Sequence, residues 1–238
     1  MLPRMTDPRI VQVDCTDGEM AMHVWTPASG SGPAILLIQE IFGVGPYIKA
    51  VAARLADAGY VVGAPDVFWR FAPGWESDHD QEGLTASFEQ VGKLDPPTAI
   101  GDCIAAAASL EAIDEVTGRP AVIGFCLGGT LAWGVAVAGD PAVCVSYYGS
   151  GVPTMLDGIA GVGCPTLFHF GNNDAFIPNE GVEAINTAID GRVGFVLNVE
   201  NAGHAFDNHE SEMFYDESAA QAAWAKTIAF LAEHMPVD

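Results

Sequence analysis

The feature of this chain that most constrains its fold is a regular alternation of short apolar runs with longer segments of helical periodicity. The runs are apolar at consecutive positions, which is typical of parallel strands that helices cover on both faces. They occupy residues 34–39, 60–64, 121–125, 143–148, 166–171 and 195–199. Helical patterns lie between them at residues 48–58, 98–116, 129–138, 180–189 and 218–234. This order predicts an α/β fold with a mostly parallel, doubly wound sheet in a three-layer sandwich.

Two further segments do not follow this alternation. Residues 10–15 and 19–26 are separated by Asp17-Gly18, which predicts an N-terminal antiparallel hairpin at the edge of the sheet. Residues 68–83 are richer in Trp, Pro, Gly and Asp and are predicted to form a long excursion beyond a strand end. Since no repeat or composition break interrupts the chain, residues 1–238 are predicted to form a single α/β domain.

The charge balance excludes one class of partner. Nine Lys plus Arg stand against thirty-one Asp plus Glu, a formal net charge of −22 at pH 7. The chain therefore lacks the basic footprint of a nucleic-acid-binding protein, and we expect no nucleic acid partner. Such acidity is typical of a solvated surface, as in a saline habitat, and it means that an anionic ligand needs a local cation to hold it.

Membrane segments and redox chemistry are not indicated by the sequence. Apolar stretches such as 34–38 and 131–138 are far shorter than the ~20 residues of a bilayer-spanning helix. Residues 1–13 do not have the pattern of a signal peptide, so we expect a cytoplasmic protein without a membrane partner.

The five cysteines are widely spaced without a C-x-x-C pair, which indicates free thiols. We also expect no metal and no cofactor, because no spacing of metal ligands or phosphate-binding loop is present.

One cysteine stands in a context that indicates chemistry. The apolar run 121–125 leads into the sequence GFCLGG at residues 124–129 and then into a helical pattern. This is a Gly-x-Cys-x-Gly turn, the thiol form of a nucleophile elbow, in which the tight turn leaves no room for side chains at the flanking positions. A helix that begins after Cys126 directs N–H groups and a partial positive charge at the sulfur, which favours the thiolate. The alternative is an inert cysteine in a glycine-rich turn.

Two later strands end at residues that complete a catalytic arrangement. The run 166–171 is followed by Asp174, and the run 195–199 is followed by His204. In the α/β-hydrolase fold, nucleophile, acid and base follow one another along the chain in this order. We therefore predict a triad in which Cys126 is the nucleophile, His204 the base and Asp174 the acid that orients the imidazole.

At this point the chain resembles the dienelactone hydrolase (carboxymethylenebutenolidase) family of the α/β-hydrolase superfamily. The matching motifs span residues 34 to 206: QEIFG at 39–43, PD at 65–66 with Arg70 and APG at 72–74, the cysteine turn, YYG at 147–149, FHFG at 168–171 with Asp174, and GHAF at 203–206. The resemblance implies an α/β-hydrolase fold, a monomer, and an enzyme that hydrolyses a small-molecule ester or lactone.

The resemblance also implies roles for residues beside the triad. Glu40 resembles the family's guard carboxylate, which pairs with the nucleophilic thiol and helps to convert it to thiolate when substrate arrives. The backbone N–H groups of Ile41 and Leu127 are expected to form the oxyanion hole, which stabilises the charge that develops on the attacked carbonyl oxygen.

Substrate contacts are implied for Arg70, Tyr148 and Phe42. Arg70 resembles one of two family arginines that bind the carboxylate of the substrate, for which a guanidinium is well suited; an exposed loop arginine is the alternative. The family's second arginine lies four residues after the catalytic histidine, where this chain has Asn208. A neutral amide does not supply the missing charge, so this departure puts affinity for a carboxylated dienelactone in doubt.

The sequence thus predicts an esterase or lactonase that works through a thioester acyl-enzyme, which water then clears with the help of His204. Two alternatives stay open. Asn208 is consistent with a broad carboxylesterase that acts on small neutral esters. From another class, the chain is a non-catalytic ligand-binding or thiol-sensing relative, in which Cys126 is modified without recovery. The sequence does not identify the physiological substrate.

Overall fold

Eight strands form one sheet in the structure, a computed structural model that describes residues 8–237. In chain order they are β1 (Arg9–Cys15), β2 (Gly18–Trp25), β3 (Ala34–Ile38), β4 (Val61–Pro65), β5 (Ala121–Phe125), β6 (Cys144–Tyr147), β7 (Thr166–Gly171) and β8 (Phe195–Glu200). The order across the sheet is β1-β2-β4-β3-β5-β6-β7-β8. β1 and β2 pair antiparallel, β2 also pairs antiparallel with β4, and the pairs from β4 to β8 are parallel. The predicted sheet and its N-terminal hairpin are confirmed.

The burial of the strands explains why the apolar runs were continuous. Every residue of β3, β4, β5, β6 and β7 is buried, because helices cover both faces of the sheet. β2 in contrast alternates between buried and more accessible residues along much of its length, as expected for a strand near the edge of the sheet. The core of the molecule therefore lies on both sides of the central strands, and the ends of these strands are held rigidly.

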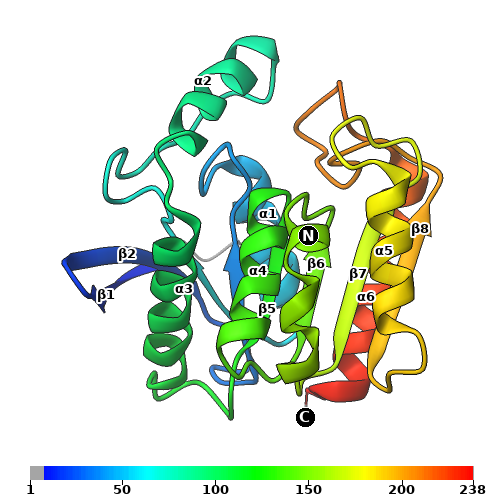
Figure 1. Cartoon of the computed structure of the whole chain (residues 1–238). Helices are drawn as coiled ribbons and strands as arrows, with labels where there is room; N and C mark the ends of the chain where they lie inside the picture. Colours follow the sequence, from blue (N-terminus) through cyan, green and yellow to red (C-terminus); the bar gives the residue numbers. More distant parts are fainter. Residues whose placement is uncertain (1–7, 238) are drawn as a thin grey trace.

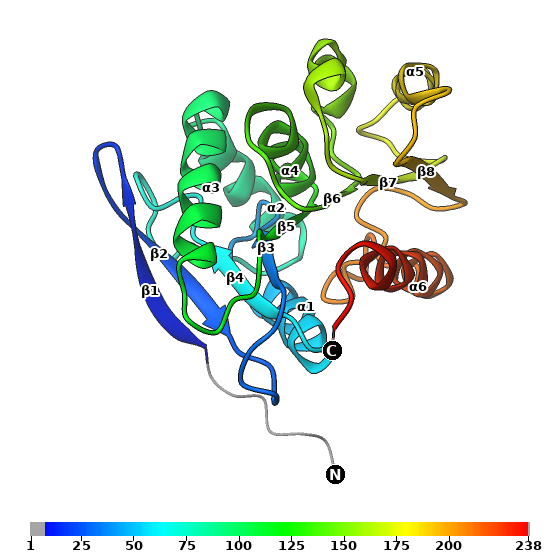
Figure 2. The ribbon, with the colours of Figure 1, turned by 90° about the horizontal axis from the view of Figure 1, so that it is seen from below.

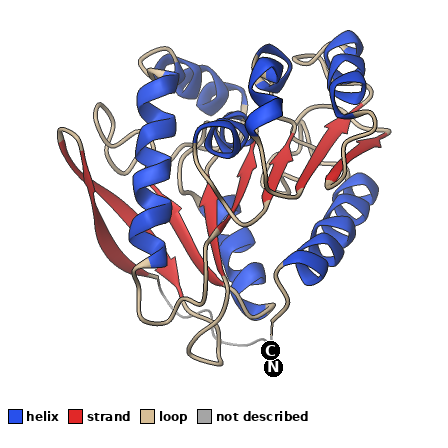
Figure 3. Ribbon diagram, turned by 60° about the horizontal axis from the view of Figure 1, so that its bottom comes forward, coloured by secondary structure: helices blue, strands red, loops and turns tan. Residues whose placement is uncertain are grey.

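Five helices form two layers around the sheet. They are α1 (Pro46–Asp57), α3 (Pro96–Glu111), α4 (Leu127–Ala138), α5 (Asn179–Ile189) and α6 (Glu217–His234). Figure 2 shows α1 and α6 on one face and α3, α4 and α5 on the other, which confirms the three-layer sandwich. Figure 3 shows the twist of the strands between these layers. Among the helices of residues 8–237, none has both the length and the apolar character that a membrane crossing needs.

A sixth helix, α2 (Gln81–Val91), was not predicted from the sequence. It follows the predicted excursion and projects beyond the sheet, apart from both helical layers (Figure 1). Its only buried residues are Gly83, Ser87 and Gln90, while the apolar Leu84 and Phe88, which stand four residues apart, are not buried. The local signal is its N-cap, where the carboxylate of Asp80 accepts the N–H of Gly83 at 2.8 Å.

Candidate active site

The turn between β5 and α4 presents Cys126 in a strained conformation. Its backbone has φ 53° and ψ −112°, a region that residues with a side chain rarely occupy. Close packing enforces the turn, because a Cβ on Gly124 would overlap the carbonyl oxygen of Gly128, and one on Gly128 would overlap that of Ile38 in β3. The expected thiol elbow thus exists, with the sulfur held at the N-terminus of α4.

The structure brings the three predicted triad residues into one hydrogen-bonded row. Nε2 of His204 lies 3.1 Å from the sulfur of Cys126, and its Nδ1 lies 2.7 Å from Oδ2 of Asp174. Asp174 follows β7 and His204 follows β8, so adjacent parallel strands deliver acid and base to the same end of the sheet as the cysteine. These are the contacts needed for proton transfer from the thiol and for fixing the tautomer of the imidazole.

Backbone hydrogen bonds hold the acid of this row in place. Oδ1 of Asp174 accepts the N–H groups of Phe176 at 2.7 Å and Ile177 at 3.0 Å, which leaves Oδ2 for the imidazole. The Asp174 side chain is fully buried. These donors fix the carboxylate in the orientation that directs Oδ2 at the imidazole.

The electrostatics of the site favour a protonated imidazole. Burial lowers the pKa of His204, but the negative sulfur of Cys126 and the hydrogen bond to Asp174 outweigh it, and the net shift is upward. A raised pKa means that His204 holds a proton at a higher pH than a free imidazole does. The arrangement thus places a proton carrier 3.1 Å from the sulfur.

A small, mostly apolar cavity of about 70 Å³ opens beside the sulfur. It is lined by Glu40, Ile41, Phe42, Leu84, Phe88, Cys126, Ser150, Phe176, His204, Ala205 and Phe214. Among residues 8–237, no Lys or Arg lines it. The cavity therefore offers aromatic and aliphatic contacts to a ligand, and the imidazole of His204, which is already paired with the carboxylate of Asp174, is its only basic side chain among the described residues.

Of the two predicted oxyanion residues, Ile41 lines this cavity and Leu127 directly follows Cys126, which also lines it. Leu127 is the first residue of α4, so its N–H has no acceptor within the helix and is available to a ligand. Ile41 lines the cavity beyond β3, as does the predicted contact residue Phe42. Tyr148 lies beneath the site: it is fully buried, its ring is 5.3 Å from that of His204, and it is not among the residues that line the cavity.

Glu40 lies beside the nucleophile, but its observed hydrogen bond is to another residue. Its Oε1 accepts Nδ2 of Asn208 at 2.7 Å, while the thiol of Cys126 is paired with His204. Burial raises the pKa of Glu40 to about 8. A carboxyl group with such a pKa is protonated at neutral pH, which distinguishes it from the ionised guard carboxylate that the resemblance implies.

The structure does not bring Arg70 to the catalytic cavity. Its guanidinium forms ion pairs with Asp17 in the β1–β2 turn and with Asp102 on α3. These residues line a separate pocket that also contains Lys93. Two carboxylates on neighbouring elements thus account for the position of Arg70. No sequence pattern indicates this pairing, because Asp17 and Asp102 are distant from Arg70 along the chain.

The residues that the sequence analysis missed come mainly from α2 and the loops after β7 and β8. Leu84 and Phe88 stand four residues apart on α2 and line the cavity. The ring of Phe176 lies 4.9 Å from that of His204 and 6.4 Å from that of Phe88. Only the i, i+4 spacing of Leu84 and Phe88 was visible in the sequence as a signal.

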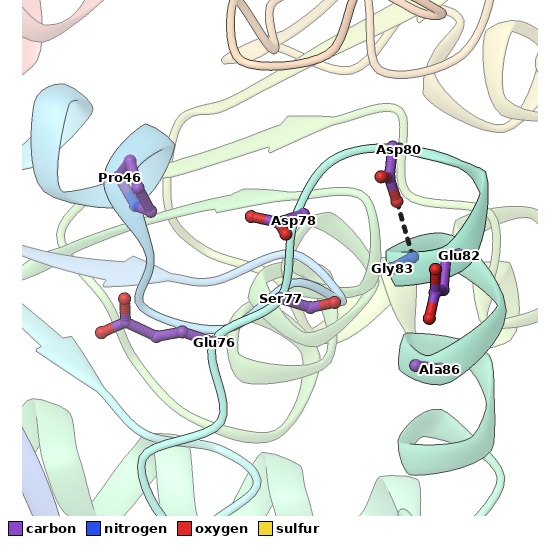
Figure 4. A pocket seen from close by; sticks show the side chains of 8 residues that line it. All are labelled: Pro46, Glu76, Ser77, Asp78, Asp80, Glu82, Gly83 and Ala86. Atoms are coloured by element: carbon purple, nitrogen blue, oxygen red, sulfur yellow. Dashed lines mark hydrogen bonds between the residues drawn. The ribbon is translucent and has the colours of Figure 1, made fainter.

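A second hollow, of about 470 Å³, lies on another side of α2 and is acidic. Glu76, Asp78, Asp80 and Glu82 line it together with small residues, as Figure 4 shows. In this close-up Asp80 turns back to cap α2 at Gly83. The carboxylates place negative charge beside the helix that borders the catalytic cavity, which disfavours the approach of an anion.

Comparisons with known proteins agree with this geometry. The sequence pattern of the dienelactone hydrolase family matches residues 20–235. A carboxymethylenebutenolidase of Pseudomonas sp. (strain P51) is 37% identical over 224 residues, which cover 92% of this chain and 92% of the relative. A carboxymethylenebutenolidase of Pseudomonas putida is 33% identical over 211 residues, which cover 88% of this chain and 89% of the relative.

Solved structures with the same fold include two enzymes of lower identity. A dienelactone hydrolase-like promiscuous phosphotriesterase from metagenomic libraries has a TM-score of 0.81 at 24% identity, over 97% of this chain and 100% of that chain. A cold-adapted esterase from an Arctic intertidal metagenomic library has a TM-score of 0.68 at 21% identity, over 95% of this chain and 93% of that chain. They show the fold alone, whereas the family match and the more identical relatives show the kinship: the chain is an ester or lactone hydrolase with the α/β-hydrolase fold, and it belongs to the dienelactone hydrolase family.

Proposed function

We propose that this hydrolase works by acyl transfer to Cys126. The observation that carries the proposal is the row of Asp174, His204 and Cys126, with contacts of 2.7 Å and 3.1 Å. The thiolate attacks the carbonyl carbon of the substrate, and the N–H groups of Ile41 and Leu127 stabilise the resulting oxyanion. The imidazolium of His204 then protonates the leaving oxygen, and the neutral imidazole activates the water that hydrolyses the thioester.

Replacement of the nucleophile tests this mechanism. Cys126→Ala is expected to lower kcat for an activated ester by on the order of 10⁶-fold, as when a triad nucleophile is removed. Cys15→Ala is the matched control, because Cys15 is the other free thiol in residues 8–237 that is not fully buried. Turnover by Cys126→Ala at a rate close to that of Cys15→Ala would exclude Cys126 as the nucleophile.

For the substrate, we propose a small neutral ester or lactone with an apolar group. The cavity lining is apolar and without Lys or Arg among the described residues, Arg70 is paired with two carboxylates, and Asn208 is neutral. An anionic substrate would lose water at its charge and would meet no cation except the imidazolium of His204, which is already paired with Asp174. The broad carboxylesterase considered from the sequence is therefore favoured over an enzyme for carboxylated lactones.

A pair of substrates separates these two activities. We expect kcat/KM for a neutral aryl ester to exceed that for a carboxylated dienelactone by at least about tenfold. This factor corresponds to the free energy of one missing hydrogen bond to the charged carboxylate of the substrate. The comparison needs equal ionic strength, because the net charge of −22 slows the encounter with an anion at low salt. A preference for the carboxylated lactone would instead point to a cation that reaches the cavity when substrate binds.

A further inference from the structure

Asn208 is completely buried, and every polar group of its side chain has a partner. Nδ2 lies 2.7 Å from Oε1 of Glu40 and 2.7 Å from Nδ1 of His79, while Oδ1 accepts the N–H of Glu210 at 3.0 Å. The N–H of Glu210 fixes the orientation of the amide, because a flipped amide would direct its own N–H groups at this donor. The two protons on Nδ2 are then donated to Glu40 and His79.

This arrangement determines the tautomer of His79. Its Nδ1 lies 2.7 Å from Nδ2 of Asn208 and 3.1 Å from Oδ1 of the same amide. Because two N–H groups could not approach to the shorter distance, Nδ1 accepts from Nδ2. The proton of the neutral ring is therefore on Nε2, which is buried and has no partner among the described residues. Burial also lowers the pKa of His79, which agrees with a neutral ring. The ring is held in place by stacking on Phe42, with centroids 4.2 Å apart and planes at 17°.

A neutral His79 in turn favours a neutral Glu40. Oε1 of Glu40 lies 3.5 Å from Nδ1 of His79, whose lone pair repels an ionised carboxylate. The carboxyl is 1% exposed and also feels the negative charge of Asp207, while His204 acts in the opposite direction. Because Oε1 accepts from Asn208, the proton of the neutral acid belongs on Oε2, and this buried atom has no partner in residues 8–237.

An unpartnered buried donor at a ligand cavity needs an acceptor. Glu40 lines the same cavity as Cys126, whose sulfur already has its partner in His204. The geometry points to Asn208 and His79 as positioning residues that hold Glu40 as a neutral acid, whose Oε2–H donates a hydrogen bond to an oxygen atom of the bound ester. This inference rests on the proposed function, and it reverses the role of an ionised carboxylate that accepts the proton of the thiol.

Two substitutions at Glu40 separate these roles. In Glu40→Gln, Oε1 is kept and an amide N–H replaces Oε2–H, so kcat/KM is expected to fall by no more than about tenfold. In Glu40→Ala the donor is lost, and a fall of about 100-fold is expected, within the range for a hydrogen bond to a developing charge. If Glu40→Gln falls as far as Glu40→Ala, an ionisable carboxyl is required and the inference is overturned.

The pH profile of kcat/KM gives a readout that a structural role would not affect. The titratable groups that face Glu40 are His79, His204, Asp207, Cys126, Tyr47 and Tyr148. With the pKa of Glu40 at about 8, wild-type kcat/KM is expected to decrease above that pH as the donor is lost. This decrease should disappear in Glu40→Gln, while a decrease of unchanged midpoint would assign it to another group and contradict the inference.

A double-mutant cycle tests the positioning by Asn208. Asn208→Leu is expected to lower kcat/KM about tenfold in the wild-type background and to have little effect in the Glu40→Ala background, because Asn208 acts through Glu40. Equal losses in both backgrounds would overturn that assignment. His79→Phe retains the stacking on Phe42 but removes the acceptor for Asn208, so it is expected to give a smaller loss than Asn208→Leu.

Two controls distinguish these results from other failures. Urea unfolding identifies variants that do not fold, and the alkylation rate of Cys126 by iodoacetamide reports whether the thiolate is intact. We expect Glu40→Gln to be alkylated at a rate close to that of the wild type. A loss of alkylation in Glu40→Gln would show that an ionised Glu40 activates the thiol, and it would overturn the inference. Full turnover by Cys126→Ala would show instead that the proposed function itself is wrong.

Discussion

One wall of the catalytic cavity comes from the strand ends of the sheet, and the other comes from α2 and the loops beside it. In the first, Cys126 and Asp174 directly follow or lie shortly after β5 and β7, which are buried along their whole length, and His204 comes after the more exposed edge strand β8. The second carries Leu84 and Phe88 on a helix with few buried residues, and the Phe88 side chain is 47% exposed. The comparison indicates that a rigid frame performs the chemistry and a loosely packed element contacts the substrate.

The largest effect that tests this division is expected at the strand ends. Asp174→Asn keeps the size of the side chain but allows the wrong tautomer of His204, so kcat should fall by about 10³- to 10⁴-fold. The thermal midpoint should change little, because the amide oxygen still accepts the N–H groups of Phe176 and Ile177. Steady-state kinetics with calorimetry measure both, and a kcat within tenfold of the wild type would contradict the triad.

A smaller effect is expected on α2. Phe88→Ala removes an aromatic side chain from the cavity wall, which should raise KM for an aryl ester by about threefold to tenfold, the equivalent of ~1 kcal/mol of aromatic contact. kcat for a small acetyl ester should be nearly unchanged, since the triad does not contact Phe88 directly. Phe195→Ala, on the edge strand β8, is a control for the loss of an aromatic ring away from the cavity. If kcat falls as strongly as KM rises, α2 also helps to position the triad.

The smallest effect is expected at Arg70. Because its guanidinium is held by Asp17 and Asp102, Arg70→Ala should leave kcat/KM within about twofold for both neutral and carboxylated substrates. It should lower the unfolding free energy by about 1–3 kcal/mol, because the buried carboxylate of Asp102 loses its cation. Activity and urea unfolding of the same preparation check this prediction. A loss confined to the carboxylated lactone would restore the substrate-binding role that the family resemblance implies for Arg70.

The sequence predicted the strand-end wall because local rules produce it. The consecutive apolar runs required buried strands, and GFCLGG at residues 124–129 required a tight turn into a helix. Parallel strands then place the residues after each strand at one end of the sheet, which is why Asp174 and His204 could be expected beside Cys126. The boundaries of these strands were predicted to within a residue or two.

The positions of Arg70, Asn208 and α2 were not predictable in the same way, because long-range contacts set them. The partners of Arg70 are 53 and 32 residues away, and the partners of Asn208 are 168 and 129 residues away. Neither pairing leaves a periodic pattern in the sequence. α2 begins at a recognisable N-cap, but the spacing of Leu84, Phe88 and Val91 is too short an apolar pattern, among polar residues, to establish a helix from the sequence.

The most direct test of the whole account is mass spectrometry of the enzyme quenched during turnover of an activated ester. We predict a burst in which the mass of the acyl group appears on the peptide that contains Cys126, followed by its decay as the substrate is exhausted. In His204→Gln, any adduct on Cys126 should persist after the substrate is exhausted, because hydrolysis of the thioester needs the imidazole. Steady turnover with acyl mass on no cysteine, or with an adduct on Cys126 that never clears, would contradict catalysis through a thioester at Cys126.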